Sequence, residues 1–276
     1  MKVLIITQYF PPEIGAAASR WGDYSRILSK NNHDVTVLCE VPNYPSGKIF
    51  ENFKNQIIQK EHINSNLKII RSLSFPTNRK GKIKKLLHYL IFMISGIFNL
   101  RKIKNYDLII VSTPPLFVGV IGLYLSKYKS MQYWLDIRDL WPDSALALNQ
   151  IKKGTIYKLG KKLEKVIYEN SQGYIFAVPD FKDYFETNFP KINKPIFNLL
   201  NGVDKRFLKN LSEQNFQRDE VFTVLFSGNI GLAQSLETLI KSAEELKNYP
   251  IYFKLVGNGV KVDYLKTLIK KRKLTN

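Results

Sequence analysis

The stretch MKVLIITQYFPPEIGAAASR, residues 1–20, decides the fold. Residues 2–7 are almost all apolar and β-branched, which is typical of a strand buried on both faces of a parallel sheet. Pro11 and Pro12 end regular structure, and Gly15 precedes small residues that open a helix. Free N–H groups at that helix start favour an anion, so the turn is a candidate phosphate site. The alternative is an ordinary tight turn between strand and helix. The turn has one glycine and not the G-x-G-x-x-G set, which disfavours binding of a nicotinamide dinucleotide here.

Composition limits the classes of protein. A chain of 276 residues suggests one large or two modest domains, and its single cysteine, Cys39, fits a reducing, cytoplasmic setting. The net charge of +19 favours an anionic partner, although a general excess of lysine, asparagine and isoleucine could produce it without a function. No nucleic-acid-binding motif is present, so an anionic membrane surface or a nucleotide-linked substrate is favoured over nucleic acid.

Strand and helix patterns alternate along the chain, which predicts an α/β fold with right-handed crossovers. Strands are expected at 34–39, 57–59, 67–71, 107–112, 131–136, 174–178 and 196–200, and helices at 16–30, 116–128, 152–169 and 179–187. After a polar stretch the pattern restarts, with strands at 221–226 and 251–256, helices at 235–247 and 262–269, and glycine-containing loops at 227–231 and 257–259. The restart indicates a second α/β unit.

The segment 79–104 is unusual because an apolar run, 86–100, lies between clusters of basic residues. The basic residues are Lys80, Lys82, Lys84 and Lys85 before the run and Arg101, Lys102 and Lys104 after it. The run is shorter than the ~20 residues that a membrane-spanning helix needs. It predicts either a core helix with charged ends or a helix that lies at a membrane interface with its lysines near anionic headgroups.

A charged cluster follows the strand predicted at 131–136. The sequence 136–143 contains Asp136, Arg138, Asp139, Trp141 and Asp143. Charged groups after a buried strand are usually paired and often functional, so this is a candidate site. A salt-bridged loop with a helix cap is the alternative interpretation.

Six motifs together resemble glycosyltransferase family 4, the retaining nucleotide-sugar transferases of the GT-B fold. Within that family the likeness is to the L-fucosaminyltransferase-like branch, which acts on 6-deoxy-N-acetylamino sugars of bacterial surface polysaccharide. The motifs are YFPPEIGA at 9–16, PNYPSG at 42–47, TPP at 113–115, RDLWPD at 138–143, NGVD at 201–204 and GNIGLAQ at 228–234. The resemblance implies two Rossmann-like domains that face a cleft.

The resemblance also implies roles for single residues. Arg138, Asp139 and Asp143 would be catalytic residues near the acceptor and the reacting sugar. Many family members have a His-Asp pair where this chain has Arg138 and Asp139, and we expect none of His33, His62 and His88 to be catalytic.

Gly15, Gly228, Asn229 and Gln234 would bind the donor diphosphate. Common members of the family have arginine and lysine at the positions of Asn229 and Gln234, so more charge stabilisation would fall to backbone amides and a guanidinium. No metal site is expected, because no Asp-x-Asp pattern occurs in the chain.

The function implied by the resemblance is transfer of a 6-deoxy-N-acetylamino hexose, with retention, from a UDP-sugar to a polyprenyl-diphosphate-linked glycan. The pathway would be that of O-antigen or capsule, at the inner face of the cell membrane. The donor is a substrate, so no cofactor is expected. A hydrolase with paired carboxylates fits less well, because the carboxylates cluster in one loop.

The domains expected are 1–205, an acceptor-side domain; 206–220, a linker; and 221–276, the start of a nucleotide-sugar-binding domain. This second domain is predicted to be incomplete, because an α/β domain takes on the order of 100 residues. We therefore expect little transferase activity from these residues alone. The alternative is a non-catalytic module of the same fold that binds an acceptor or a membrane.

Overall fold

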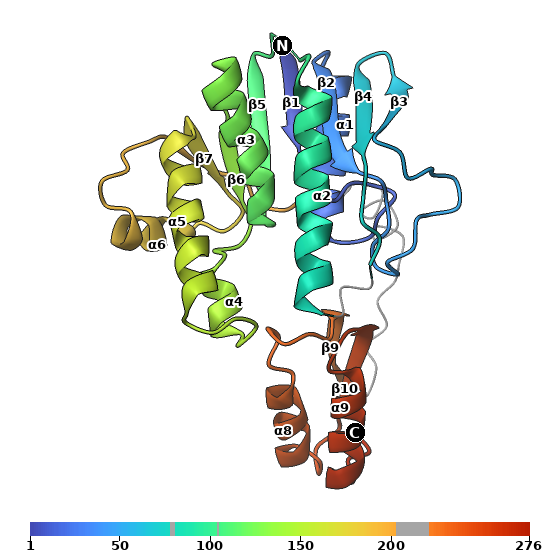
Figure 1. Cartoon of the computed structure of the whole chain (residues 1–276). Coiled ribbons are helices and arrows are strands. Elements are labelled where there is room, and N and C mark those ends of the chain that lie inside the picture. Colours follow the sequence, from blue (N-terminus) through green and yellow to red (C-terminus); the bar gives the residue numbers. More distant parts are fainter. Residues whose placement is uncertain (78–80, 104, 203–220) are drawn as a thin grey trace. The chain divides into compact units, whose positions relative to one another are not determined.

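The computed structural model describes residues 1–77, 81–103, 105–202 and 221–276 (Figure 1). The linker predicted at 206–220, the motif residues Val203 and Asp204, and the basic residues Lys80 and Lys104 lie outside the described residues, as does the side chain of Lys82. The chain divides into two compact units, Met1–Asp204 and Lys205–Asn276, and each is described by itself.

The first unit is built on an eight-stranded sheet with the order β3-β4-β2-β1-β5-β6-β7-β8. The strands are β1 (Lys2–Ile6), β2 (Asp34–Glu40), β3 (Ile58–Asn64), β4 (Leu67–Ser72), β5 (Leu108–Thr113), β6 (Trp134–Ile137), β7 (Gly173–Phe176) and β8 (Ile196–Asn198). All neighbouring pairs are parallel except the hairpin of β3 and β4. The order changes direction between β1 and β5, and open α/β sheets bind ligands beyond the carboxyl ends of strands at such a point.

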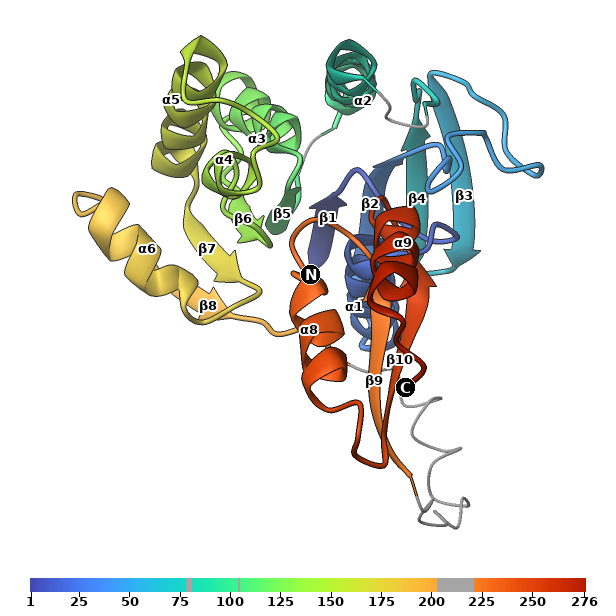
Figure 2. The same cartoon turned by 90° about the horizontal axis from the view of Figure 1, so that it is seen from below.

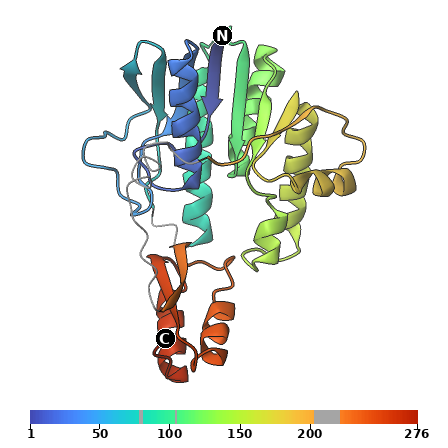
Figure 3. The same ribbon diagram turned by 180° about the vertical axis from the view of Figure 1, so that it is seen from behind.

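Helices cover both faces of this sheet, which explains why its central strands are apolar on both sides. Helix α1 (Ala16–Lys30) lies on one face (Figure 3). Its Trp21 and Tyr24 pack in the core on that face. On the other face lie α2, α3, α5 and α6, whose apolar side chains share one core with β1, β5, β6 and β7 (Figure 2). Their bounds are Lys82–Leu100, Leu116–Lys129, Thr155–Asn170 and Phe181–Asn188, and the short helix α4 is Asp143–Ala147.

The second unit contains a parallel pair of strands, β9 (Phe222–Asn229) and β10 (Ile251–Asn258), with α8 (Glu237–Glu245) and α9 (Val262–Arg272). Ile230, Leu236, Ile240 and Leu265 form its core. Among the described residues, these two strands and two helices make a small α/β layer with one uncovered sheet face, where Leu225 is 60% exposed and Val256 46%.

Two predicted loops of this unit were wrong at their amino ends. Residues 227–229 belong to β9 and residues 257–258 belong to β10, so that Gly228 pairs with Gly257 and Asn229 with Asn258. A Cβ atom on Gly257 would lie 1.8 Å from the carbonyl oxygen of Gly228. The glycines therefore extend the strands here by letting two backbones approach closely, where the sequence pattern suggested a loop.

Candidate functional site

The candidate site of the first unit centres on Asp136, near the carboxyl end of β6. Its side chain is completely buried. The Asp136 Oδ1 atom accepts hydrogen bonds from Arg20, at 2.8 Å from Nη2 and 3.3 Å from Nε, and Oδ2 accepts from Trp21 Nε1 at 2.9 Å and from Ser112 Oγ at 2.6 Å. A buried carboxylate with this many donors is satisfied and rigid.

Arg138 lies next to this carboxylate and is held by two further bonds. Its Nε donates to Ser112 Oγ at 2.9 Å, and its Nη2 donates to the carbonyl of Pro114. The Arg138 Nε is 3.8 Å from Asp136 Oδ2, and 15% of its side chain is exposed. Burial lowers the pKa of Arg138, and the neighbouring positive charge of Arg20 lowers it further. The negative charge of Asp136 acts in the other direction and raises the pKa. A fixed guanidinium at the carboxyl edge of a parallel sheet can bind a phosphate or a developing oxyanion.

The other two predicted catalytic carboxylates do not join this cluster. Asp139 is exposed beside Arg138. Asp143 begins α4 and accepts hydrogen bonds from Tyr157 at 2.6 Å, Lys161 at 3.1 Å and Tyr184 at 2.5 Å. Partial burial alone would raise the pKa of Asp143, but these three donors hold it below its ordinary value. The bonds of Asp143 join α4, α5 and α6, which is the salt-bridged alternative weighed for this segment.

Gly15 lies at the start of α1 with a φ of 147°, in the region that favours glycine. No side chain caps this helix. A Cβ atom on Gly15 would lie 3.6 Å from Cε1 of Tyr44, so the turn lies against the loop that follows β2. Its carbonyl accepts the first bond of the helix, from Ser19 N at 2.9 Å. The start of α1 thus lies in contact with the loop after β2, and a phosphate site at Gly15 stays a prediction.

Glu13 fastens these two loops together. Its Oε1 accepts the backbone N–H groups of Asn43 and Tyr44, both at 2.9 Å, and its Oε2 accepts that of Phe10 at 3.3 Å. Burial raises the pKa of Glu13 to about 7, with a contribution from the nearby Glu40, although the three backbone bonds oppose the shift. The motifs at 9–16 and 42–47 therefore lie together because one carboxyl group binds both.

Glu40, at the end of β2, organises a second buried polar cluster. It accepts hydrogen bonds from Gln8 at 3.0 Å, Ser74 at 3.1 Å and Asn43 at 3.2 Å. His88, fully buried on α2, places its Nε2 3.4 Å from Glu40 Oε1 and its Nδ1 2.9 Å from the carbonyl of Phe75. His88 therefore lies outside the Asp136 cluster, and the expectation that it is not catalytic stays a prediction.

In the second unit the predicted donor-binding residues lie at the carboxyl end of β9 and just after it. Gly228 has a φ of 156° and lies one residue before the end of β9, where it pairs with Gly257. The side chains of Asn229 and Gln234 both flank Gly231: a Cβ atom there would lie 2.4 Å from Asn229 Nδ2 and 2.8 Å from Gln234 Oε1. The structure thus brings Asn229 and Gln234 together around Gly231, with both side chains exposed.

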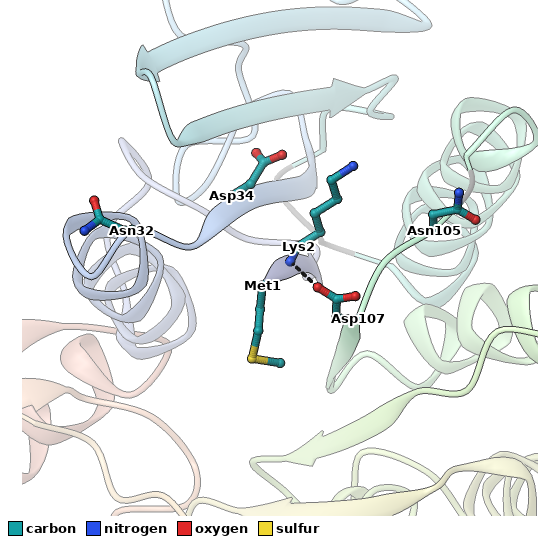
Figure 4. Close-up of a pocket in the computed structure, with 6 residues that line it drawn as sticks. All are labelled: Met1, Lys2, Asn32, Asp34, Asn105 and Asp107. Carbon is teal, nitrogen blue, oxygen red and sulfur yellow. Dashed lines mark hydrogen bonds between the residues drawn. The ribbon is translucent and has the colours of Figure 1, made fainter.

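An open hollow lies at the opposite edge of the first sheet, at the amino ends of β1, β2 and β5 (Figure 4). It is lined by Met1, Lys2, Asn32, Asp34, Asn105 and Asp107, and the backbone N–H of Lys2 donates to Asp107 Oδ2 at 2.7 Å. None of the predicted site residues lines this hollow. Within the described ranges, no group of three or more histidine, cysteine, aspartate or glutamate side chains could hold a metal ion.

Sequence reasoning did not select Arg20, Ser112, Glu13 or Glu40 as site residues. Arg20 had a usable signal, because it occupies the helix position before Trp21 and four before Tyr24, on the face that packs on the sheet. Glu40 is the last residue of β2, at the carboxyl edge of the sheet where open α/β sheets bind ligands. Ser112 had no signal beyond its position in a buried strand, and its partner is 24 residues away.

The chain is similar to known proteins in sequence and in fold. No protein-family model matches the chain. WcaI of Escherichia coli (strain K12) is assigned to the glycosyl transferases of colanic acid biosynthesis. The chain is 25% identical to it over an alignment 295 residues long, gaps included, which covers 100% of this chain and 70% of WcaI. By this comparison the chain is a homologue of a glycosyltransferase of polysaccharide biosynthesis.

Solved structures show the same fold. The sucrose-phosphate synthase of Thermosynechococcus elongatus has a TM-score of 0.71 at 15% identity, over 99% of this chain and 68% of that one. The catalytic domain of starch synthase IV from Arabidopsis thaliana, bound to ADP and acarbose, has a TM-score of 0.64 at 11% identity, over 98% of this chain and 70% of that one. The fold is of the GT-B type, as predicted, and its second domain is incomplete beside these structures.

Proposed function

We propose that the chain acts in a sugar transferase that moves a 6-deoxy-N-acetylamino hexose, with retention, from a UDP-sugar to a polyprenyl-diphosphate-linked glycan of O-antigen or capsule. The observation that carries the proposal is the fixed guanidinium of Arg138 at the carboxyl edge of the sheet, in a chain that aligns along its whole length with a glycosyltransferase. The finer family, glycosyltransferase family 4 and its L-fucosaminyltransferase-like branch, is part of this proposal.

The proposed chemistry follows from the charge on the leaving group. As the bond between sugar and diphosphate breaks, negative charge grows on the diphosphate, and fixed donors that need no reorganisation stabilise it. Arg138 would supply a guanidinium, and the backbone N–H groups after Gly15 would supply further donors in the first unit. Departure of the diphosphate by this route is proposed to need no metal ion or cofactor.

The acceptor side is proposed to lie at the loops that Glu13 joins, because Tyr9 and Tyr44 are partly exposed there and their rings are 6.1 Å apart. Tyrosine rings beside polar groups suit a sugar, which presents both C–H faces and hydroxyl groups. Asp139 is exposed next to Arg138 and is the carboxylate available to contact the acceptor hydroxyl.

Titration of UDP and of a UDP-N-acetylamino sugar, followed by calorimetry, tests the donor site. Micromolar affinity that falls in an Arg138→Gln variant and persists in an Arg26→Gln control supports the proposal, since Arg26 lies on the surface of α1. With a labelled donor and a polyprenyl-diphosphate glycan, the anomeric configuration of any product tests retention. Absence of donor binding by the folded chain would overturn the proposal.

A non-catalytic acceptor- or membrane-binding module is the second candidate function. It is favoured by the small second unit, where two strands with one uncovered face leave little surface for a nucleotide base and ribose. Glycan binding without any donor binding would select this candidate.

A further inference from the structure

Most residues of helix α2 are apolar, and only one side of the helix is covered. His88, Phe92, Ser95, Gly96 and Leu100 are buried and face the rest of the first unit. On the opposite side lies an apolar stripe that consists of Ile83, Leu87, Ile94 and Phe98, which are spaced four, seven and four positions apart and are 75%, 40%, 61% and 44% exposed. An exposed apolar face that runs from Ile83 to Phe98 marks an interaction surface.

The ends of the stripe are basic. Lys84 is exposed at its beginning, and Arg101 and Lys102 are exposed at its end. The Arg101 guanidinium lies 3.9 Å from the centre of the Phe98 ring, so its positive charge lies directly beside the apolar stripe. The helix sequence contains no aspartate or glutamate, and the whole chain has a net charge of +19. An anionic surface would therefore meet attraction at both ends of α2 and no opposing carboxylate on it.

The helix is fixed along the surface of the unit. Gly96 permits close packing against α3, since a Cβ atom there would lie 2.9 Å from Cδ1 of Ile121. Asn99 donates to the carbonyl of Ile57 at 2.7 Å and to Ser72 Oγ at 2.8 Å, and Ser95 donates to the carbonyl of Leu73 at 3.2 Å. By length and composition the segment Ile83–Leu100 is, among the described residues, the one that could cross a membrane, and 28% of it is buried. Its packing against α3 and the sheet favours a helix that lies in the interface over one that spans the bilayer.

We propose that the apolar stripe of α2 docks on an anionic lipid bilayer, with Ile83, Leu87, Ile94 and Phe98 among the acyl chains and Lys84, Arg101 and Lys102 at the headgroups. This surface would hold the first unit at the membrane where a polyprenyl-linked acceptor resides. The inference does not depend on sugar transfer, because lipid binding is measured without turnover.

Co-sedimentation with vesicles of phosphatidylcholine and phosphatidylglycerol tests the proposal. The protein is expected to pellet with these vesicles, to pellet less at high salt and to stay in solution with pure phosphatidylcholine. Ile94→Glu is expected to weaken the partition by about tenfold or more, because it puts a charge into the apolar stripe. Ile156→Glu is the matched control, since Ile156 is 66% exposed on α5, and it should bind as the unaltered protein does.

A second pair of variants tests the basic ends. The double variant Arg101→Gln, Lys102→Gln should bind anionic vesicles about fivefold more weakly for each charge removed, because each basic residue near the surface contributes about 1 kcal/mol. Lys152→Gln, Lys153→Gln, in the exposed segment before α5, is the control for net charge. Equal binding by all variants, or no binding by the unaltered protein, would overturn the proposal. So would a concentration-dependent dimer without lipid that Ile94→Glu abolishes, which would assign the stripe to a second copy of the chain.

Discussion

Arg20 and Asp136 form an ion pair in which both side chains are completely buried, with Arg20 Nη2 2.8 Å from Asp136 Oδ1. Arg20 also donates from Nη1 to Asn201 Oδ1 at 3.0 Å. One guanidinium therefore connects α1, the carboxyl end of β6 and the segment after β8. Tyr24, one turn later on α1, donates to the carbonyl of Leu200 at 2.7 Å and holds the same segment.

Replacing Asp136 should cost the first unit much of its stability. Asp136→Asn leaves the buried Arg20 without its countercharge, and breaking a buried pair in this way costs about 3–5 kcal/mol. Urea unfolding at neutral pH measures the difference. Asp139→Asn, on an exposed side chain three residues after Asp136, should change the free energy of unfolding by no more than about 0.5 kcal/mol. Equal effects of the two variants would show that the ion pair is not what stabilises this edge.

Replacing Arg138 should affect function more than stability. Its guanidinium is partly exposed and bonds to Ser112 and a carbonyl, so Arg138→Gln should fold. If it stabilises the departing diphosphate, kcat for sugar transfer, in a preparation with measurable turnover, should fall on the order of 10²–10³-fold, with a smaller change in KM for the donor. The Arg26→Gln variant, on the surface of α1, controls for lost positive charge. A raised KM with unchanged kcat would show instead that Arg138 binds the donor equally in ground and transition states.

The alternation of apolar runs predicted the sheet of the first unit well, because its central strands are buried on both faces and have no other stable place. Residues 2–7 and 34–39 were predicted as strands and are β1 and β2, and the run at 67–71 lies in β4. The strand expected at 57–59 reaches only the start of β3, Ile58–Asn64. Strand ends were less accurate where glycine pairs with glycine. Gly228 and Gly257 were interpreted as turn residues, whereas in the structure they lie in β9 and β10 and let the two backbones approach closely.

The site was predicted in part, for a physical reason. Arg138 stands out in the sequence because a charge directly follows a buried strand, but its setting depends on Arg20 and Ser112, which are far away in the sequence. Asp143 carries the same kind of signal and belongs to another network, because its donors Tyr157, Lys161 and Tyr184 come from later helices. Local patterns identify charged residues near strand ends, whereas their partners are determined by packing.

A methyl group on Gly257 should destabilise the second unit. Its Cβ atom would lie 1.8 Å from the carbonyl oxygen of Gly228, and its φ of 153° disfavours any side chain. Gly257→Ala is expected to lower the free energy of unfolding by about 1–3 kcal/mol and to increase hydrogen exchange of the β9 and β10 amides. Gly202→Ala, where a Cβ atom meets no heavy atom within 4 Å, is the control and should leave that exchange unchanged. Unchanged exchange in Gly257→Ala would contradict the close pairing of these strands.

Glu164 should make stability depend on pH in a defined range. Its side chain is fully buried, and burial raises its pKa from 4.5 to about 7, although Lys161 at 2.5 Å opposes the shift. The fold therefore favours the neutral carboxyl group, so its contribution to stability is complete below pH 4.5 and is lost as the pH rises through about 7. The pKa of Asp143 in the same network is lowered from 3.8, so its effect appears only at more acidic pH.

Glu164→Gln cannot ionise, so its Tm relative to the unaltered protein should increase as the pH rises from 4.5 to about 7. Thermal unfolding followed by circular dichroism across this range measures the difference. Glu186→Gln is the control, because Glu186 is 66% exposed in a surface pair with Lys182 and should show a constant difference. A relative Tm of Glu164→Gln that falls with rising pH would mean that the ion pair with Lys161 outweighs burial, and that Glu164 is charged in the folded protein throughout this range.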